Sequence, residues 1–196
     1  MVPRELRKNL TPTIAQEQAR AVVRKAVVQA NEEIITMGSL DRDLKNMGTT
    51  IVLALWRKGH EMYIANLGDS RAYLIRADAI EQLTIDHSLA QALVENKTIS
   101  ASEAKEHRFR NVLWKYLGSK EVGDGPDVKA IPIQVGDKFV LCSDGMSGPV
   151  PDAQILSFVK ENPDVQACAD GLGKLALDNG SRDNVSVIVI EVVEGR

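Results

Sequence analysis

The chain has 196 residues, of which 44% are hydrophobic and 26% charged, and its formal net charge is -3. This is the composition of an ordinary globular protein, and it gives no electrostatic reason to expect a nucleic acid or an anionic membrane as partner. The first residues contain no apolar core of the signal-peptide kind, and no stretch approaches the length of a membrane span. Cys142 and Cys168 lie in apolar runs without metal-type spacing, so we expect reduced thiols in a cytoplasmic protein.

Residues 14–37 have the clearest helical pattern. Small and β-branched apolar residues recur at the spacing of one helical face, from Ala19 to Ile34. Thr13 followed by Gln16 predicts an N-terminal cap, and Gly38 predicts the end of the helix.

Three short stretches rich in β-branched and aromatic residues follow, at 49–56, 61–68 and 71–75. The turn-like RKGH between the first two predicts an antiparallel meander whose strands are covered on both faces. Residues 88–117 are rich in Ala, Glu and Lys but have no strong apolar face. We expect them to form two or three short helices in an excursion from the sheet.

The second half of the chain predicts strands at 128–135 and 138–143, joined by Gly136-Asp137 as a hairpin turn. Helices are expected at about 152–160 and at 163–178, and a last strand at 184–193. Strand runs that alternate with helical pairs predict an α+β fold, in which antiparallel sheets are covered by helices. No linker or repeat interrupts the pattern, so we expect a single domain over 1–196.

Carboxylates lie at the ends of several predicted strands: Asp69, Asp86, Asp144 and Asp183. Such carboxylates can converge at one rim of a sheet, where Mg²⁺ or Mn²⁺ prefers hard oxygen ligands. Each position taken alone is more typical of an ordinary turn, above all Asp144-Gly145. Residue types alone therefore favour turns over a metal site.

Six motifs in a fixed order change this weighting. They are MGTTIVLAL at 47–55, ANLGDSRAYLI at 65–75, LTIDHS at 83–88, RNVLWKYLG at 110–118, GDKFVLCSDG at 136–145 and SRDNVSVIVI at 181–190. Together they closely resemble the metal-dependent protein serine/threonine phosphatases of type 2C (the PPM family), in the bacterial style. The resemblance covers nearly the whole chain.

The resemblance implies a sandwich of two antiparallel β-sheets flanked by helices. It also implies hydrolysis of phosphoserine and phosphothreonine in proteins by a water that two Mn²⁺ or Mg²⁺ ions activate, without a protein nucleophile. The expected partners are a phosphorylated protein substrate and a cognate serine/threonine kinase, with no nucleic acid and no membrane.

By the same resemblance, Asp144 and Asp183 are ligands of the core metal site, and Asp86 joins Asp144 around a weaker third metal. Asn184, which would orient Asp183, and Gly145 would support these ligands. Three further residues would form a structural motif: Asp69, Ser70 and Arg71. Residues 88–117 would be the flap segment that lies beside the active site in this family and influences substrate choice.

The chain departs from the family pattern at its start. Family members begin with a strand that carries an acidic ligand and a phosphate-binding arginine, followed by a DGxGG motif whose aspartate bridges the two metals. The 196 residues contain no DGxGG. We therefore expect an N-terminally incomplete fold that lacks its first strands and holds only half of the metal cage. We also expect sheet edges that are open to pairing with another chain.

Three hypotheses remain: the greater part of an active phosphatase, a truncated pseudophosphatase that acts as a binding or regulatory module, and a fragment complemented by another chain. The presence of Asp86, Asp144 and Asp183 together favours the first, since a chain without metal chemistry has no physical need for all three.

Overall fold

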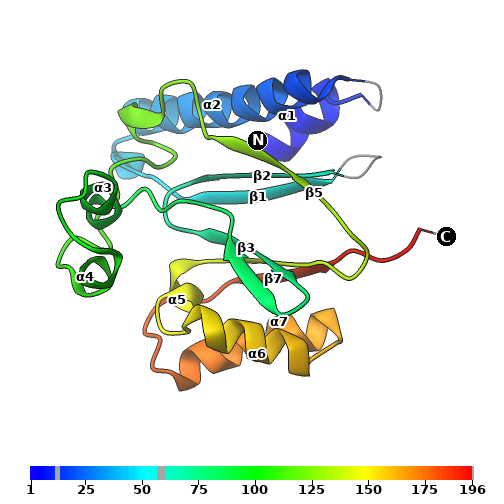
Figure 1. The fold of residues 1–196 in the computed structure, drawn as a ribbon. Helices are drawn as coiled ribbons and strands as arrows, with labels where there is room; N and C mark the ends of the chain where they lie inside the picture. The colour runs from blue at the N-terminus through cyan, green and yellow to red at the C-terminus, as the bar shows by residue number, and fades with distance from the viewer. Residues whose placement is uncertain (12–13, 57–60, 196) are drawn as a thin grey trace. The chain divides into compact units, whose positions relative to one another are not determined.

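The fold is seen in a computed structural model that describes residues 1–11, 14–56 and 61–195 (Figure 1). The chain divides into two compact units, which are described separately below. The first comprises Met1–Ile51, Ala65–Asp69 and Ile85–Lys129, and the second comprises Val52–Ile64, Ser70–Thr84 and Ala130–Arg196. The single-domain organisation stays a prediction.

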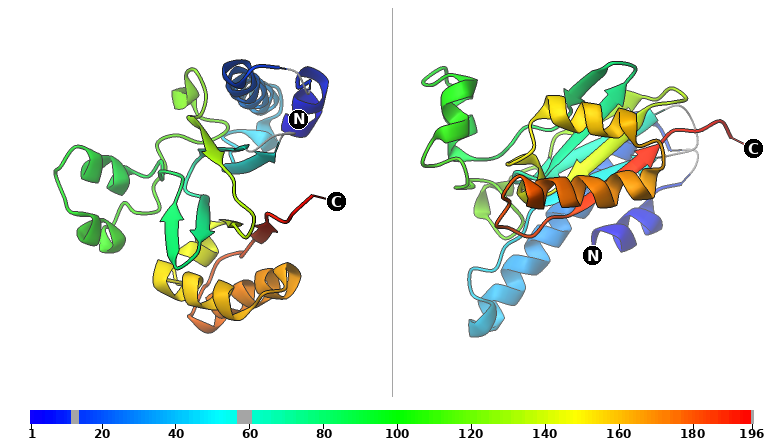
Figure 2. Two further views of the ribbon diagram at one scale, coloured as in Figure 1. Left: turned by 45° about the vertical axis from the view of Figure 1, so that its right-hand side comes forward. Right: turned by 90° about the horizontal axis from the view of Figure 1, so that it is seen from below.

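The first unit begins with two helices, α1 (Val2–Asn9) and α2 (Gln16–Leu40), which lie side by side (Figure 2). The buried residues of α2 recur at helical spacing from Ala19 to Ala30, which confirms the predicted helix. The predicted end at Gly38 is wrong, because α2 continues to Leu40 and a short 3₁₀ turn, η1 (Arg42–Leu44), follows. A side chain at Gly38 would lie 2.9 Å from the carbonyl oxygen of Leu44, so the glycine serves this close return of the chain. The predicted cap at Thr13 lies outside the described residues, and α1 was not predicted.

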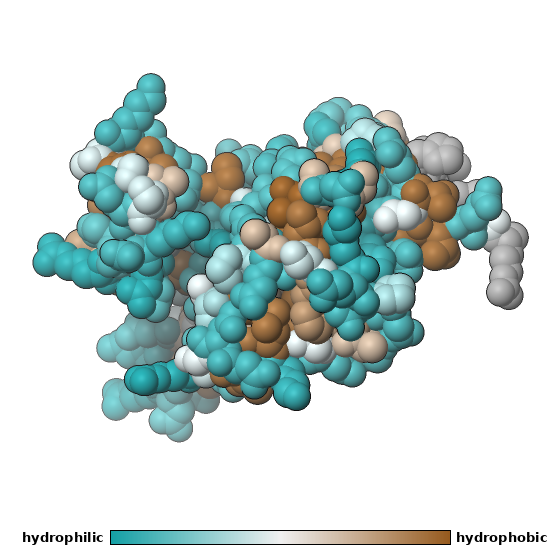
Figure 3. All heavy atoms as spheres, turned by 60° about the horizontal axis from the view of Figure 1, so that its bottom comes forward, coloured by the Kyte–Doolittle hydropathy of each residue, from teal (hydrophilic) through white to brown (hydrophobic). Residues whose placement is uncertain are grey.

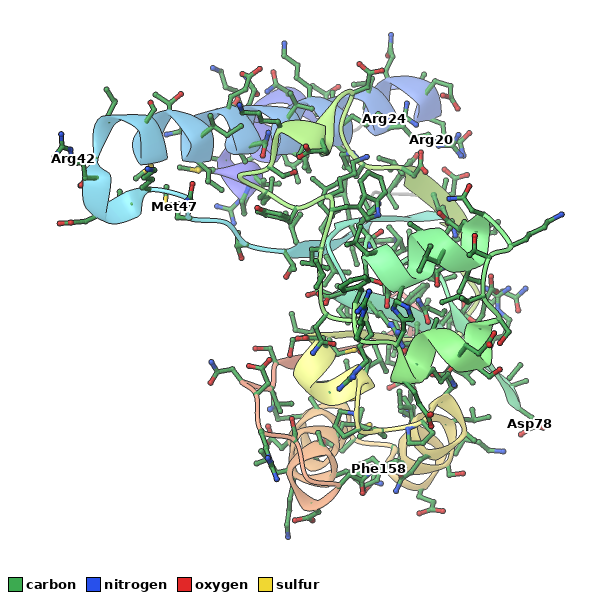
Figure 4. The ribbon with its side chains drawn as sticks, turned by 90° about the vertical axis from the view of Figure 1, so that its left-hand side faces the viewer. Arg20, Arg24, Arg42, Met47, Asp78 and Phe158 are labelled. Atoms are coloured by element: carbon green, nitrogen blue, oxygen red, sulfur yellow. The ribbon has the colours of Figure 1, made fainter. Side chains whose placement is uncertain are left out.

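A buried amide fastens α2 to a later loop of the same unit. The Asn31 side chain accepts a hydrogen bond from the N–H of Gly118 at 2.6 Å and donates to the carbonyl of Ser119 at 3.2 Å. Arg24, labelled in Figure 4, donates from the same helix to the carbonyl of Pro126 at 3.3 Å. These bonds satisfy backbone groups of a loop that has little regular structure of its own beyond the 3₁₀ turn η2 (Lys120–Val122).

The segment 88–117 contains two short helices, α3 (Leu89–Glu95) and α4 (Ala101–Glu106), as predicted. Ser88 and Ser100 cap them by accepting from the N–H groups of Gln91 and Glu103. The two ends of the excursion are joined where Leu89 donates to Val112 at 2.8 Å and Trp114 donates to His87 at 3.0 Å.

The strands form two sheets. The first has the order β1 (Ile51–Trp56), β2 (Glu61–Leu67), β5 (Val128–Pro132). The second is antiparallel and has the order β4 (Ala79–Gln82), β3 (Arg71–Arg76), β6 (Lys138–Cys142), β7 (Val187–Glu191).

This topology corrects two predictions. The three-stranded meander is wrong, because β3 pairs with β4 and β6 in the second sheet and not with β2. The hairpin at Gly136-Asp137 is also wrong, because β5 and β6 belong to different sheets. In both places the chain crosses from one sheet to the other instead of forming a hairpin. Strand β4 was not predicted, and the RKGH turn at 57–60 lies outside the described residues.

Within the second unit, the second sheet is covered on both faces, which explains why its strands are apolar throughout. On one face, Tyr73, Val140 and Cys142 pack against the helices α5 (Asp144–Ser147), α6 (Asp152–Glu161) and α7 (Val165–Asp178). On the other face, Leu74 and Phe139 pack with residues of β1 and β2. Strands of both sheets thus enclose one core, which makes this part of the unit a sandwich.

The helices α6 and α7 lie side by side over the second sheet (Figures 1 and 2). Phe158 of α6 lies between the two helices in Figure 4, and a side chain at Gly171 of α7 would come within 2.5 Å of the Phe158 ring. Glycine at this position therefore lets the helices pack closely. The predicted helix at 152–160 is confirmed. The helix predicted at 163–178 begins slightly later, at Val165, and its predicted end at Asn179-Gly180 is confirmed.

A buried ion pair holds the crossover from β5 to β6. Asp137 is 1% exposed and accepts from Nε and Nη2 of Arg76, both at 2.7 Å. Its carboxylate also accepts from the N–H of Gln134 at 2.8 Å, and Gly136 has a φ of 91°, which favours glycine. The carboxylate thus closes the loop in place of a hairpin partner.

Strand β7 forms an edge of the second sheet, and Ile188 in it is 58% exposed. Figure 3 shows one face of the molecule on which hydrophobic side chains form separate patches among polar ones. The pairing of open edges with another chain stays a prediction. Among the described residues, no helix combines the length and the apolar character needed to cross a membrane.

The substitution Asp137→Asn should lower the free energy of unfolding by about 2 kcal/mol. It removes a charge-assisted bidentate hydrogen bond and leaves the Arg76 guanidinium without its anionic partner. The matched control is Asp78→Asn, since Asp78 pairs with Lys160 but its side chain is 86% exposed. We expect the control to leave stability nearly unchanged, because solvent and salt screen an exposed ion pair. Urea unfolding at pH 7 measures both.

The pH dependence offers a second test of the same ion pair. Burial alone would raise the pKa of Asp137, but the hydrogen bonds from Arg76 and Gln134 together hold it below its usual value of 3.8. A carboxyl with a lowered pKa stabilises the fold above its unfolded pKa and loses that contribution as the pH falls through the folded one. The difference in the free energy of unfolding between wild type and Asp137→Asn should therefore be constant above about pH 5 and shrink below about pH 4. A difference that grows on acidification would contradict this account.

Candidate metal centre

The pairing of β6 with β7 brings two distant loops to one end of the second sheet. Cys142, the last residue of β6, is paired with Val187, the first residue of β7, and with Arg71, the first residue of β3. Because the strands are antiparallel, the residues that follow β6 and those that precede β7 emerge at the same edge. Asp144 and Asp183 lie in these two loops.

Asp144 does not lie in a simple turn. It is the first residue of the short helix α5, and Ser143 precedes this helix in an extended conformation. The Asp144 side chain is half-buried, and its Oδ1 accepts from the N–H of Gly145 at 2.9 Å. Asp183 is exposed, and its Oδ1 accepts from the N–H of Asn184 at 2.7 Å. Each carboxylate is thus oriented by the backbone N–H of the residue that follows it.

The two loops touch at Gly145. A side chain on Gly145 would overlap the carbonyl oxygen of Asn184 and would lie 3.4 Å from Cβ of Asp183. Glycine is therefore required here for the approach of two backbones, since the clash falls on backbone atoms that have no rotamer to change.

The charge environment favours a cation at this edge. Neither Asp144 nor Asp183 is paired with a Lys, Arg or His side chain among the residues that the structure describes. Carboxylate oxygens without a cationic partner are the ligands that Mg²⁺ and Mn²⁺ take, so the two side chains fit part of such a site. Within the described ranges, however, no group of three or more His, Cys, Asp or Glu side chains is placed to hold a metal ion.

Asp86 belongs to the first unit, whereas Asp144 and Asp183 belong to the second. Next to it, Nδ1 of His87 lies 3.1 Å from the nitrogen and 3.2 Å from the oxygen of Gly68, and its ring packs edge-on against Trp114. Burial lowers the pKa of His87, and the nearby Lys115 lowers it further. The half-buried His87 therefore supports the turn at Gly68, which has a φ of 102° and leaves no room for a side chain beside Thr50.

The remaining predicted motif, Asp69 to Arg71, follows β2 and includes the first residue of β3. Arg71 donates from Nη1 to the hydroxyl of Tyr73 at 3.0 Å, and Ser70 is buried. Burial raises the pKa of Tyr73, so this hydroxyl stays protonated. These contacts are structural in kind. The roles assigned to these residues, and those of Asn184 and Asp86, stay predictions.

Sequence reasoning missed two serines that join the loops. Ser181 donates from Oγ to the carbonyl of Gly145 at 2.7 Å, and Ser143 donates from Oγ to the carbonyl of Asn184 at 3.2 Å. The signal that could have drawn attention to both is their position, since each stands one or two residues before a predicted ligand.

Comparison with known families matches residues 5–185 to the family described as Protein phosphatase 2C. The chain belongs to this family. It is 34% identical over 184 residues to the serine/threonine phosphatase stp of Listeria innocua, an alignment that covers 94% of this chain and 72% of the relative. The resemblance seen in the sequence motifs is confirmed, and the relatives are named serine/threonine phosphatases.

Two solved structures are similar over nearly the whole chain. The serine/threonine phosphatase PstP/Ppp of Mycobacterium tuberculosis has a TM-score of 0.87 at 33% identity, covering 98% of this chain and 80% of that one. The catalytic domain of PstP in complex with two manganese ions has a TM-score of 0.80 at 32% identity, covering 98% and 78%. The predicted fold, two antiparallel sheets with flanking helices, is thereby confirmed.

The substitution Gly145→Ala should lower the free energy of unfolding by about 2 kcal/mol, because the added methyl group forces the two loops apart. The control is Gly173→Ala in the interior of α7, where a side chain would meet nothing within 4 Å. That substitution should raise stability by about 0.5 kcal/mol through better helix propensity. Thermal unfolding of both variants measures the effect, and equal behaviour of the two would rule out the close approach at Gly145.

Proposed function

We propose that this chain hydrolyses phosphoserine and phosphothreonine in proteins, with Asp144 and Asp183 as ligands of divalent metal ions. The family is one of serine/threonine phosphatases, and its substrates are phosphorylated proteins. The observation that supports the proposed site is the pair of carboxylates that face no cationic side chain of the described residues and lie on two touching loops at one end of the sheet.

The metal ions supply the reactive chemistry when they are bound, because Mn²⁺ or Mg²⁺ lowers the pKa of a bound water and offsets the charge of the phosphoryl oxygens. The chain's own residues supply position. The N–H groups of Gly145 and Asn184 each hold Oδ1 of the preceding aspartate, which restricts the rotation of each carboxylate. The short helix α5 and the pairing of β6 with β7 anchor the two loops on a packed core through Met146 and Val187.

Further parts of the proposal rest on the family resemblance. Asp86 would contribute to a weaker third ion, and the segment 88–117 would influence substrate choice. A structure of the similar PstP catalytic domain contains two manganese ions, which supports Mn²⁺ as the ion to test first. We also propose a cognate serine/threonine kinase and a cytoplasmic location, the latter supported by two buried free cysteines.

A second function is favoured by one observation. Among the described residues, no group of three or more His, Cys, Asp or Glu side chains is placed to hold a metal ion, and the 196 residues contain no DGxGG. A regulatory module that binds phosphorylated protein without turnover would have such an incomplete set of metal ligands. Two-metal hydrolysis requires both ions to be held, so the two functions are separated by whether turnover appears.

The test is hydrolysis of a phosphothreonine peptide with Mn²⁺, by the 196-residue chain and by a fusion that adds the N-terminal segment of the Listeria innocua phosphatase lying before the matched region. We expect little turnover from the chain alone, since two carboxylates hold an ion weakly, and clear Mn²⁺-dependent turnover from the fusion. Asp144→Asn in the fusion should remove at least about 99% of this turnover, by loss of a metal ligand. Asp78→Asn serves as the control and should leave it unchanged.

A folded fusion that binds Mn²⁺ but shows no turnover would support the regulatory module. Strong turnover by the 196-residue chain itself that survives Asp144→Asn would contradict the proposed site.

A further inference from the structure

Two serine side chains connect the loops that carry Asp144 and Asp183. The Ser143 hydroxyl donates to the carbonyl of Asn184 at 3.2 Å and accepts from the N–H of Ser186 at 3.0 Å. The backbone of Ser143 also donates to the carbonyl of Ser186 at 3.0 Å, which extends the pairing of β6 with β7 by one step. Ser143 is therefore bound to the second loop by both its backbone and its side chain.

Ser181 makes the connection from the other side. Its hydroxyl donates to the carbonyl of Gly145 at 2.7 Å, while its own N–H donates to the carbonyl of Ala176 at 2.9 Å, near the end of α7. The residue thus ties the loop before β7 to α5 on one side and to α7 on the other. All three elements belong to the second unit.

These bonds bracket both proposed ligands. Asp144 lies between Ser143 and Gly145, and both of these residues contact the opposite loop. Asp183 lies between Ser181 and Asn184, which receive or make the same contacts. Neither loop can move relative to the other without breaking at least one of these hydrogen bonds or separating the backbones that meet at Gly145.

We propose that Ser143 and Ser181 are positioning residues that set the spacing of the Asp144 and Asp183 carboxylates for a divalent ion. The proposal rests on the function proposed above, because it takes these carboxylates as metal ligands. An ion that binds both carboxylates must restrict any motion of the loops, and this loss of conformational entropy weakens its binding. The loss of residues that orient metal ligands typically weakens metal binding about 10- to 100-fold. The Ser143 hydroxyl is engaged as donor and acceptor, which agrees with a positioning role and not with that of a nucleophile.

The first experiment measures Mn²⁺ binding to the 196-residue chain by calorimetry. Ser143→Ala and Ser181→Ala should each weaken binding about 10-fold, whereas Ser181→Thr keeps the hydroxyl and should stay within about threefold of wild type. The control is Ser157→Ala, because the exposed hydroxyl of Ser157 donates to the carbonyl of Ala153 within α6. Unchanged Mn²⁺ affinity in both alanine variants would overturn the positioning role.

The second measurement needs no metal. Hydrogen–deuterium exchange should become faster at the Ser186 amide in Ser143→Ala, and across 144–148 and 182–187 in Ser181→Ala, with no change in Ser157→Ala. If the 196-residue chain binds no measurable Mn²⁺, the same variants are compared in the fusion described above. Absence of Mn²⁺ binding by the fusion would contradict the proposed function, whereas the exchange data decide independently whether the serines hold the loops. Exchange that is unchanged in both alanine variants would overturn the proposal whatever the metal does.

Discussion

The register of β6 against β7 is the constraint on which the candidate site depends. It places Cys142 opposite Val187, so Asp144 and Asp183 follow and precede paired strand ends. Gly145 then permits the two backbones to touch, and the hydroxyls of Ser143 and Ser181 fasten them. A shift of the register by one residue would turn the Cys142 side chain away from the helix-covered core and would also separate the two loops. The packing of the sheet and the geometry of the site therefore require the same register.

The motifs that identified the family have physical reasons in each unit. In the first unit, Gly68 of the GDSR stretch meets His87 of the TIDHS stretch and approaches Thr50 of the MGTT stretch, while Trp114 packs on His87. In the second unit, the SDG and SRDN stretches meet at Gly145. The family motifs are far apart in the sequence, but within each unit they contact one another. Each motif therefore supplies a contact on which another motif depends.

The sequence allowed prediction of elements whose signal is local. The helical face of α2, the end of α7 at Asn179-Gly180 and the carboxylates at strand ends could all be found from spacing and turn residues. Partners in space could not. Gly136-Asp137 has the composition of a hairpin, yet β5 and β6 enter different sheets and Asp137 bonds Arg76, which is far away in the sequence. The roles of Ser143 and Ser181 likewise exist only once the two loops are side by side.

The central claim, that Asp144 and Asp183 form one site, is tested most directly by a double-mutant cycle of Mn²⁺ binding, measured by calorimetry on wild type, Asp144→Asn, Asp183→Asn and the double variant. Because one ion would contact both carboxylates, each single substitution should remove nearly as much affinity as the double, giving a coupling energy of more than about 1 kcal/mol. Affinity losses that simply add, or Mn²⁺ binding that neither substitution changes, would contradict the claim.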